Sequence, residues 1–296
     1  MVFREFVTEV DTGDVALSCL VATAVHSDGP AASGSRPVVI ALHGFPDHRG
    51  SFRPLFAPLV NAGMDVVAPA LRGYSPSGKA RSGRHDALAA GEDAVALANH
   101  FSMGRPVRLV GHDWGAIAAF AAVSKAPERF SHLVTMAVPH PAAMLRAFRR
   151  PAQLKRSWYM GMFQLPKVAE YQLSKDNFAL VDRLWKNWSP GYEAPAGEIS
   201  AVKGGISERV GEVLQYYRAL RDPARLRQAR PTFGKVRVPS IHIHGENDGC
   251  IGAECCAGAE RFYQSGFTLH TLQGAGHFFI HEKPDQVARI LVDFLR

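Results

Sequence analysis

The sequence predicts an α/β protein in which helices cover both faces of a mainly parallel β-sheet. Short runs rich in β-branched residues are typical of strands buried on both faces, and segments with helical spacing of apolar residues lie between several of them. After Pro139 this alternation stops, and about ninety residues of helical, basic and Trp-rich sequence precede the next strand, which begins near Val238. We therefore expect an α/β core with an inserted helical unit.

The expected elements follow one another along the chain in the order of such a fold. An antiparallel pair, Phe3–Val10 and Val15–Thr23, comes first. The sheet then takes its other strands from Pro37–Leu42, Met64–Ala68, Val107–Val110, Leu133–Val138 and Ser240–His244. Helical patterns cover Ala87–His100, Ala116–Lys125 and the final segment Pro284–Arg296, whose apolar residues recur at core-facing spacing.

Two domains follow from this order. Residues 1–139 and 232–296 are predicted to form the discontinuous core domain, and residues 140–231 a helical cap domain. The cap is expected over the carboxyl ends of the strands, because open α/β sheets bind their ligands there.

Composition and charge narrow the function. With 47% hydrophobic and 21% charged residues among 296, the chain has ordinary globular composition, which excludes a disordered, collagen-like or coiled-coil protein. The net charge of +7 comes from one segment, since Met144 to Arg230 holds 16 Lys and Arg against 8 Asp and Glu. No nucleic-acid-binding motif accompanies it, so a solvated basic face is expected and no nucleic-acid partner.

The early sequence predicts no membrane partner. The longest uncharged run near the start, Val15 to Ser27, covers 13 residues, which is too short for a membrane-spanning helix, and acidic residues precede it. A cytoplasmic protein of unknown oligomeric state is the expectation.

The cysteines and clustered histidines are expected to be structural. Four cysteines, three of them at Cys250, Cys255 and Cys256, make no disulfide framework, and their spacing is not that of a metal site. His242 and His244 alternate within an apolar run, which suggests strand positions rather than converging ligands. We therefore expect buried thiols, no metal and no cofactor.

The clearest sign of chemistry is Gly111-His112-Asp113-Trp114-Gly115, between a predicted strand and a predicted helix. It has the form of a nucleophile elbow, G-x-S-x-G, with aspartate in place of serine. Small residues flank such a nucleophile because the tight turn leaves no room for larger side chains. An Asp that merely caps the helix would not explain both glycines, so Asp113 is predicted to be a nucleophile.

Three further positions complete a catalytic set. In His43-Gly44-Phe45-Pro46-Asp47, after the strand Pro37–Leu42, the amide of Phe45 is expected to form an oxyanion hole with the amide of Trp114. Asp248 follows the strand Ser240–His244, and His277 lies in Gly274-Ala275-Gly276-His277. Asp113, Asp248 and His277 thus occur in the order nucleophile, acid, histidine, with Glu246 as a competing acid.

At this point the chain resembles the α/β-hydrolase superfamily, and within it the branch of epoxide hydrolases and haloalkane dehalogenases. The resemblance covers nearly the whole chain through HGFPD at 43–47, RGYSPSG at 72–78, GHDWG at 111–115, GENDG at 245–249 and GAGH at 274–277. The aspartate nucleophile separates this branch from esterases and lipases. An aspartate that displaces a leaving group from a saturated carbon forms an ester, which activated water can hydrolyse, so epoxides or alkyl halides are the implied substrates.

The resemblance also implies two acids in the cap. Epoxide hydrolases polarise the epoxide oxygen with two cap tyrosines, whose contexts look like those of Tyr159 and Tyr217. Helical spacing turns Tyr217 toward the apolar face of its segment, and Tyr216 is expected to point elsewhere. Many haloalkane dehalogenases have Asn as a halide donor where this chain has Phe45, which favours epoxides, although the indole of Trp158 is an alternative donor.

The sequence thus predicts an epoxide hydrolase that converts a small apolar epoxide and water to a vicinal diol. Two alternatives stay open, a haloalkane dehalogenase with the same nucleophile and a non-catalytic, ligand-binding member of the fold. The pocket walls are expected to include Trp158, Met160, Phe163 and Phe278, beside Phe45 and Trp114.

Overall fold

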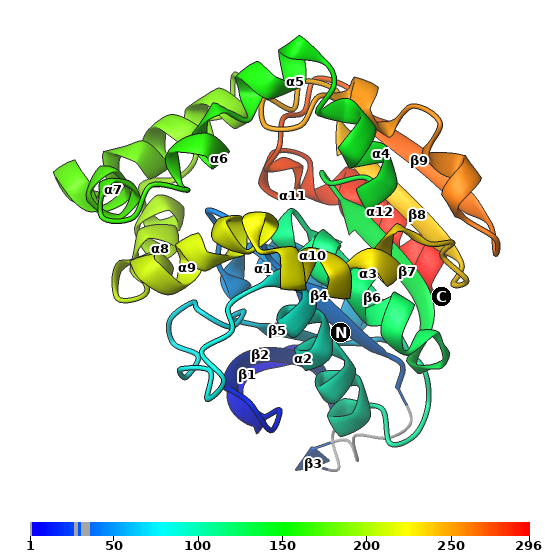
Figure 1. The fold of residues 1–296 in the computed structure, drawn as a ribbon. Helices are drawn as coiled ribbons and strands as arrows, with labels where there is room; N and C mark the ends of the chain where they lie inside the picture. Colours follow the sequence, from blue (N-terminus) through cyan, green and yellow to red (C-terminus); the bar gives the residue numbers. More distant parts are fainter. Residues whose placement is uncertain (1, 27–28, 31–35) are drawn as a thin grey trace.

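A nine-stranded sheet forms the centre of the molecule. The computed structural model describes residues 2–26, 29–30 and 36–296. The strand order is β1-β2-β5-β4-β6-β7-β8-β9, with β3 beside β2. Figure 1 shows β1 and β2 (blue) at one edge of this sheet and β9 (orange) at the other. The strands are β1 Phe3–Asp11, β2 Ala16–His26, β3 Gly29–Pro30, β4 Val38–Leu42, β5 Asp65–Pro69, β6 Val107–His112, β7 Phe130–Met136, β8 Ser240–Gly245 and β9 Phe267–Leu272.

The helices alternate with these strands until β7 and then follow one another. Before β7 lie η1 Arg49–Phe52, α1 Arg53–Asn61, α2 Ala87–Phe101, α3 Trp114–Lys125 and η2 Pro127–Arg129. Between β7 and β8 lie α4 Pro141–Ala147, α5 Pro151–Arg156, α6 Trp158–Met162, α7 Val168–Trp188, α8 Ala196–Ser207, α9 Val210–Arg218, η3 Ala219–Arg221, α10 Pro223–Gln228 and η4 Arg230–Phe233. The chain ends with η5 Ala253–Cys256, η6 Ala259–Phe262, α11 Phe279–Glu282 and α12 Pro284–Leu295.

The predicted fold class is confirmed. Strands β4 to β9 are parallel neighbours, while β2 pairs antiparallel with both β1 and β5. The expected strands and the helices α2, α3 and α12 are present, with ends shifted by a few residues. The sequence analysis did not anticipate β9, an edge strand with most of its residues exposed or half-buried, because such a strand lacks a continuous apolar run.

Alternation along each strand divides the interior into two hydrophobic cores. Ile40 packs in the core that also contains apolar residues of α2 and α3, and the adjacent Val39 packs in the core formed with α1 and α12. Successive side chains of a strand point to opposite faces, so every central strand must be apolar on both sides. This explains the β-branched runs of the sequence.

The helices between β7 and β8 contact the loops at the carboxyl ends of the strands. We call residues 137–239 the helical insert; the domain boundaries expected at 140 and 231 stay a prediction. Trp185 of α7 donates its indole N–H to the carbonyl oxygen of Pro46 at 2.8 Å. The carbonyl oxygen of Trp188 accepts from the amides of Gly249 and His277 at 3.0 and 2.9 Å. Figure 1 shows α7, α8 and α9 together at one side of the molecule, with α10 in front of the sheet.

No helix among the described residues combines the length and the apolar character needed to cross a lipid bilayer.

The turn between β6 and α3 is too tightly packed for side chains at its two glycines. A Cβ atom on Gly115 would lie 2.0 Å from the carbonyl oxygen of Leu42, and one on Gly111 would lie 2.2 Å from the carbonyl oxygen of Gly115. Both distances are far below any van der Waals contact, and both partners are backbone atoms. The close approach of this turn to β4 therefore requires glycine.

We predict that Gly115→Ala lowers the free energy of unfolding by about 3 kcal/mol, because the backbone must move to admit the methyl group. The matched control is Gly204→Ala in α8, where a Cβ atom meets nothing within 4 Å. There alanine should raise stability by about 0.5–1 kcal/mol through its better helix propensity. Denaturant unfolding of the three proteins measures both effects, and equal midpoints for the two variants would contradict the packing argument.

Candidate active site

Asp113 has a strained backbone conformation at the turn between β6 and α3. Its φ of 52° and ψ of −118° lie in a region that residues with a Cβ atom rarely adopt. Such strain persists only where the surrounding structure enforces it, and it is common at functional sites. Here the strand on one side and the helix on the other enforce it, and they direct the carboxylate of Asp113 toward a cavity that it helps to line.

Two backbone amides hold this carboxylate. The N–H of Phe45 donates to Oδ1 of Asp113 at 2.8 Å, and the N–H of Trp114 also donates to the carboxylate. Gly44 makes this approach possible, since a Cβ atom there would lie 2.4 Å from the Asp113 side chain. The two amides that the sequence predicts as an oxyanion hole thus both donate to the carboxylate of Asp113.

His277 lies between Asp113 and Asp248. Its Nδ1 is 2.8 Å from Oδ2 of Asp248, and its Nε2 is 3.8 Å from Oδ2 of Asp113. Asp248 accepts two further hydrogen bonds at Oδ1, from the amides of Cys250 and Ile251 at 2.7 and 2.8 Å. The carboxylate of Asp248 can only accept a hydrogen bond, so Nδ1 of a neutral His277 carries the proton that it donates. Nε2 of His277 then has a free lone pair.

The competing acid lies elsewhere. Glu246 is exposed, and its Oε2 accepts from the amide of Gly274 at 2.9 Å. The structure therefore pairs His277 with Asp248 and not with Glu246.

Asp113, Asp248 and His277 are buried close together, so their charges shift the pKa of Asp113 and that of His277. Burial disfavours the charged form of His277, but the nearby carboxylates of Asp248 and Asp113 outweigh it and raise the pKa of His277. Burial raises the pKa of Asp113, while His277 and the two amides work in the opposite direction. An imidazole whose cation is stabilised in this way is suited to accept a proton from water.

Two tyrosines of the helical insert reach the same cavity. Tyr159 and Tyr217 are both buried, and their ring centroids are 5.8 Å apart. The hydroxyl of Tyr159 lies 3.4 Å from Sγ of Cys250, whereas that of Tyr217 has no hydrogen-bond partner among the described residues. Burial raises the pKa of both phenols well above 10, and the charge of Asp113 adds to this at each of them, so both hydroxyls stay protonated at neutral pH.

The cavity has a volume of about 330 Å³ and is lined mainly by apolar side chains. Asp113, Tyr159 and Tyr217 lie on its wall with Trp114 and Met160. Four exposed apolar side chains of the insert also line it and form its mouth, namely Leu145, Leu220, Leu226 and Phe233. A site of this kind accepts apolar ligands of small to moderate size.

Three of the four expected pocket residues lie off the cavity wall. Trp158 is 42% exposed, and its ring lies 4.9 Å from the guanidinium of Arg183. Adjacent residues of a helix point about 100° apart, so the turn of α6 that directs Tyr159 inward directs Trp158 outward. Phe163 and Phe278 are buried behind the wall, where Phe163 packs against Tyr217 and Phe278 stacks on Trp185 at 3.7 Å. Of the four, only Met160 is a lining residue.

The sequence analysis missed two residues at the site. Cys250 contacts the hydroxyl of Tyr159, although its sequence context gives no sign of this. Tyr216, expected to point elsewhere, also lines the cavity with its ring, while its hydroxyl donates to the carbonyl oxygen of Arg72 at 3.0 Å. Its hydroxyl is thereby occupied, which distinguishes it from Tyr217.

Two groups of potential metal ligands lie in and beside the cavity, Asp113 with Cys250 and His277, and Asp47 with Glu198 and His281. In the first group the protein already binds the carboxylate and the imidazole through Phe45 and Asp248. Ordinary hydrogen bonding therefore accounts for this first group.

Asp47, the last residue of the HGFPD segment, is a second buried carboxylate with a shifted pKa. It accepts from the amide of His48 at 2.8 Å and from the hydroxyl of Ser51, and Oδ2 lies 3.8 Å from Nδ1 of His112. Burial outweighs these contacts and raises the pKa of Asp47 from 3.8 to about 7. The folded protein thus retains a proton that the unfolded chain releases.

This predicts a specific pH dependence of stability. Between pH 3.8 and 7 folding takes up a proton at Asp47, so the free energy of unfolding falls as the pH rises, by up to about 1.4 kcal/mol per pH unit from this group. Asp47→Asn keeps an acceptor but removes the titration, so its stability relative to the native protein should increase across this window and level off above it. Chemical denaturation at several pH values measures the difference, and parallel curves would contradict the raised pKa.

Comparisons with known proteins identify the family of this chain. Residues 37–284 match the family model described as alpha/beta hydrolase fold. The chain is 30% identical over 280 residues to Epoxide hydrolase 3 of Xenopus tropicalis, an alignment that covers 90% of this chain and 73% of that protein. It is 29% identical over 293 residues to AB hydrolase superfamily protein YfhM of Bacillus subtilis, with 97% and 96% coverage.

Solved structures give the same result. The crystal structure of the Bacillus megaterium epoxide hydrolase in complex with an inhibitor superposes with a TM-score of 0.80 at 27% identity, covering 97% of this chain and 99% of that one. The resemblance drawn from the five sequence motifs is thereby confirmed, and the chain belongs to the α/β-hydrolase family, in its epoxide hydrolase-like branch.

Proposed function

We propose that this protein is an epoxide hydrolase that converts an apolar epoxide and water to a vicinal diol through a covalent ester on Asp113. The observation that carries the proposal is that the carboxylate of Asp113 and the buried phenols of Tyr159 and Tyr217 line one mainly apolar cavity. A nucleophile and acids that share a cavity can act on the carbon and the oxygen of the same epoxide ring. Neither the attack of the carboxylate on the epoxide nor the hydrolysis of the resulting ester requires a metal or a cofactor.

In the first step Oδ2 of Asp113 attacks a ring carbon while Tyr159 and Tyr217 donate to the ring oxygen. The new C–O bond forms as the ring C–O bond breaks, and a proton from a phenol converts the departing alkoxide to a hydroxyl group. The amide of Phe45 binds Oδ1 at 2.8 Å, which leaves Oδ2 as the oxygen for attack. Asp113 is a nucleophile only as a carboxylate, and the amides and His277 stabilise that form against burial.

In the second step water hydrolyses the ester. Nε2 of His277 accepts a proton from water, which attacks the carbonyl carbon of the Asp113 ester. The amides of Phe45 and Trp114 stabilise the developing negative charge on the ester oxygen. Asp248 stabilises the imidazolium through its 2.8 Å contact with Nδ1. As the intermediate collapses, the C–O bond to the substrate breaks and the departing alkoxide takes the proton from His277 to give the diol. The carboxyl group of Asp113 then loses its own proton, which passes to the tyrosinate directly or through solvent.

The leaving group decides between epoxides and alkyl halides. A halide departs unprotonated and needs N–H donors, whereas an alkoxide needs an acid. Trp114 lines the cavity, and its indole N–H is a donor of the kind that a halide needs. The second indole considered for this task, that of Trp158, lies off the cavity and beside Arg183. Two phenols that line the cavity and carry O–H donors favour the epoxide.

We predict that removing both hydroxyls slows diol formation from styrene oxide by about 10²- to 10⁴-fold, the range of general acid catalysis. The single variants Tyr159→Phe and Tyr217→Phe should lose less, because one phenol still donates. The control Tyr216→Phe removes a hydroxyl that is bound to Arg72, so its loss should be far smaller.

The same proteins are assayed for chloride release from 1-chlorohexane. Diol formation that depends on both tyrosines, without chloride release, supports the epoxide hydrolase. Chloride release by the native protein that survives the double substitution would favour the dehalogenase, and binding of either compound without turnover would favour the ligand-binding alternative.

A second prediction concerns the covalent ester. Asp113 attacks as an anion and needs no base, so His277→Gln should block the hydrolytic step. Alkylation should continue at a lower rate, because the two backbone amides still stabilise the carboxylate while the contribution of His277 is lost. Intact-protein mass spectrometry after addition of styrene oxide should show one substrate mass added to the protein, located at Asp113 by peptide mapping. Asp113→Ala combined with His277→Gln is the control and should gain no mass. An unmodified His277→Gln protein would argue for direct attack of water on the epoxide.

A further inference from the structure

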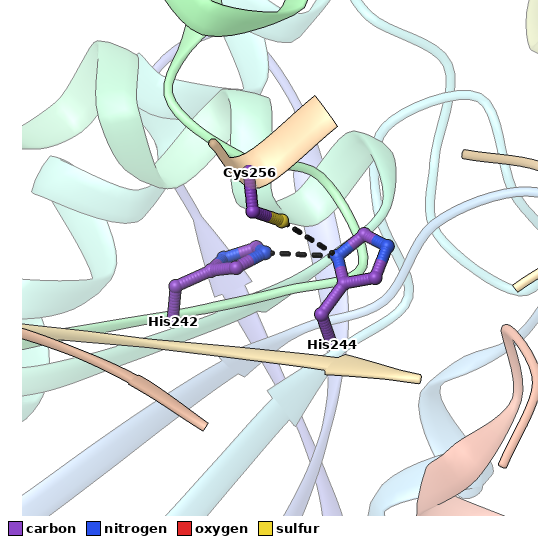
Figure 2. Close-up of side chains that lie close together, drawn as sticks. All are labelled: His242, His244 and Cys256. Carbon is purple, nitrogen blue, oxygen red and sulfur yellow. Dashed lines mark hydrogen bonds between the residues drawn. The ribbon is translucent and has the colours of Figure 1, made fainter. Parts of the chain in front are cut away.

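Two histidines of β8 and a cysteine of η5 converge in the interior, away from the cavity. Figure 2 shows His242 and His244 side by side on the same strand, with Cys256 above them. Nε2 of His242 lies 3.0 Å from Nδ1 of His244, and Sγ of Cys256 lies 3.3 Å from the same Nδ1. All three side chains are buried. The alternation that the sequence analysis took as a sign of strand positions is what brings the two imidazoles together, because residues i and i+2 of a strand share a face.

The outer contacts of both imidazoles fix the arrangement. Nε2 of His244 lies 2.8 Å from the carbonyl oxygen of Ile251, which only accepts, so this nitrogen carries the proton and Nδ1 presents a lone pair. Nδ1 of His242 lies 2.8 Å from Oγ1 of Thr135, a hydroxyl that can donate or accept. Both Nε2 of His242 and Sγ of Cys256 are therefore directed at one lone pair of His244, which can satisfy only one strong donor.

We propose that His242, His244 and Cys256 form a binding site for a thiophilic divalent cation of the Zn²⁺ class. Two imidazole nitrogens and a thiolate are a ligand set that zinc accepts in proteins. The ligands belong to two segments, β8 and η5, which a bound ion would join. The inference does not depend on the proposed function, and the sequence analysis, which expected no metal, did not anticipate it.

The distances suit such an ion after a small adjustment. Zinc bonds of about 2.0–2.1 Å to nitrogen and about 2.3 Å to sulfur, in tetrahedral geometry, separate two nitrogens by about 3.3 Å and a nitrogen and a sulfur by about 3.6 Å. The observed 3.0 and 3.3 Å are each shorter by a few tenths of an ångström, which rotation of the side chains can supply. A water molecule would complete the fourth position.

The surroundings of His244 also match those of metal-binding histidines, which usually donate their second ring N–H to a carboxylate, a backbone carbonyl or a water molecule. His244 already does so to Ile251. His242 would do so to Thr135 once its proton moves from Nε2 to Nδ1, and the hydroxyl of Thr135 then accepts.

When the metal ion binds, the thiol of Cys256 releases one proton. The S–H bond of Cys256 breaks, the sulfur binds the metal, and the proton passes to solvent. The two imidazoles stay neutral, so the site gains one positive charge. Asp248, whose Oδ2 lies 3.8 Å from Nε2 of His244, supplies a compensating carboxylate.

The test is a titration of the full chain with Co²⁺, a spectroscopic substitute for Zn²⁺ whose bond to a thiolate absorbs in the near ultraviolet. Cys256→Ser removes the proposed sulfur ligand, and Cys255→Ser is the matched control. Cys255 is the adjacent buried thiol, but its Sγ is turned to Oε1 of Gln153 at 3.4 Å. Cys250→Ser reports on the thiol beside the active-site residues Asp113 and His277. Native mass spectrometry with Zn²⁺ gives the stoichiometry.

The native protein, Cys255→Ser and Cys250→Ser should each bind one ion per chain with the thiolate absorption. Cys256→Ser should lose the absorption, and His242→Gln should bind more weakly by roughly tenfold or more. If Cys256→Ser fails to fold, as judged by circular dichroism, His242→Gln decides in its place. The proposal is overturned if the native protein shows no such absorption, if folded Cys256→Ser retains it, if His242→Gln binds as the native protein does, or if Cys250→Ser abolishes it.

Discussion

The candidate site depends on how closely the turn after β6 approaches the end of β4. Gly115 packs against the carbonyl oxygen of Leu42, and Gly44 packs against the side chain of Asp113. Since no side chain separates the two segments, the amides of Phe45 and Trp114 reach the same carboxylate. A buried carboxylate is costly unless hydrogen bonds or charges compensate it, and here the compensation comes from His277 and from backbone amides that the sheet holds in place.

The helical insert positions residues as well as covering them. The carbonyl oxygen of Trp188 accepts from the amides of Gly249 and His277, which belong to the loops of the acid and of the histidine. One peptide group of α7 therefore binds both loops, and the indole of Trp185 binds the loop that carries the Phe45 amide. Movement of α7 would disturb the histidine, the acid and the oxyanion hole together. The insert also supplies both phenols, so the site exists only when core and insert are assembled.

The sequence predicted the strands of the core, and it placed Asp113, Asp248 and His277 close together, better than it predicted the walls of the cavity. Asp113, Asp248 and His277 each follow a strand or lie in a glycine-framed loop, so local sequence identifies their positions. Wall residues depend on the rotation of short helices, and a turn of α6 by one residue would exchange Trp158 for Tyr159. The same limit applies to Cys250 and Cys256. The partner of Cys250, Tyr159, is distant in the sequence, and the partner of Cys256, His244, belongs to another element. Their contacts follow from tertiary packing, which no local pattern encodes.

Unsatisfied hydrogen-bonding atoms point to the same chemistry as the motifs. A buried polar atom without a partner costs about 1–3 kcal/mol, so it persists where something other than the protein completes it. Two such atoms in the described part of the chain belong to the proposed site, the hydroxyl of Tyr217 and Nε2 of His277. The first belongs to a residue that lines the same cavity as Asp113, and the second is an acceptor 3.8 Å from the carboxylate of Asp113. An epoxide oxygen would complete the first and a water molecule the second, and these are the two reactants of the proposed hydrolysis.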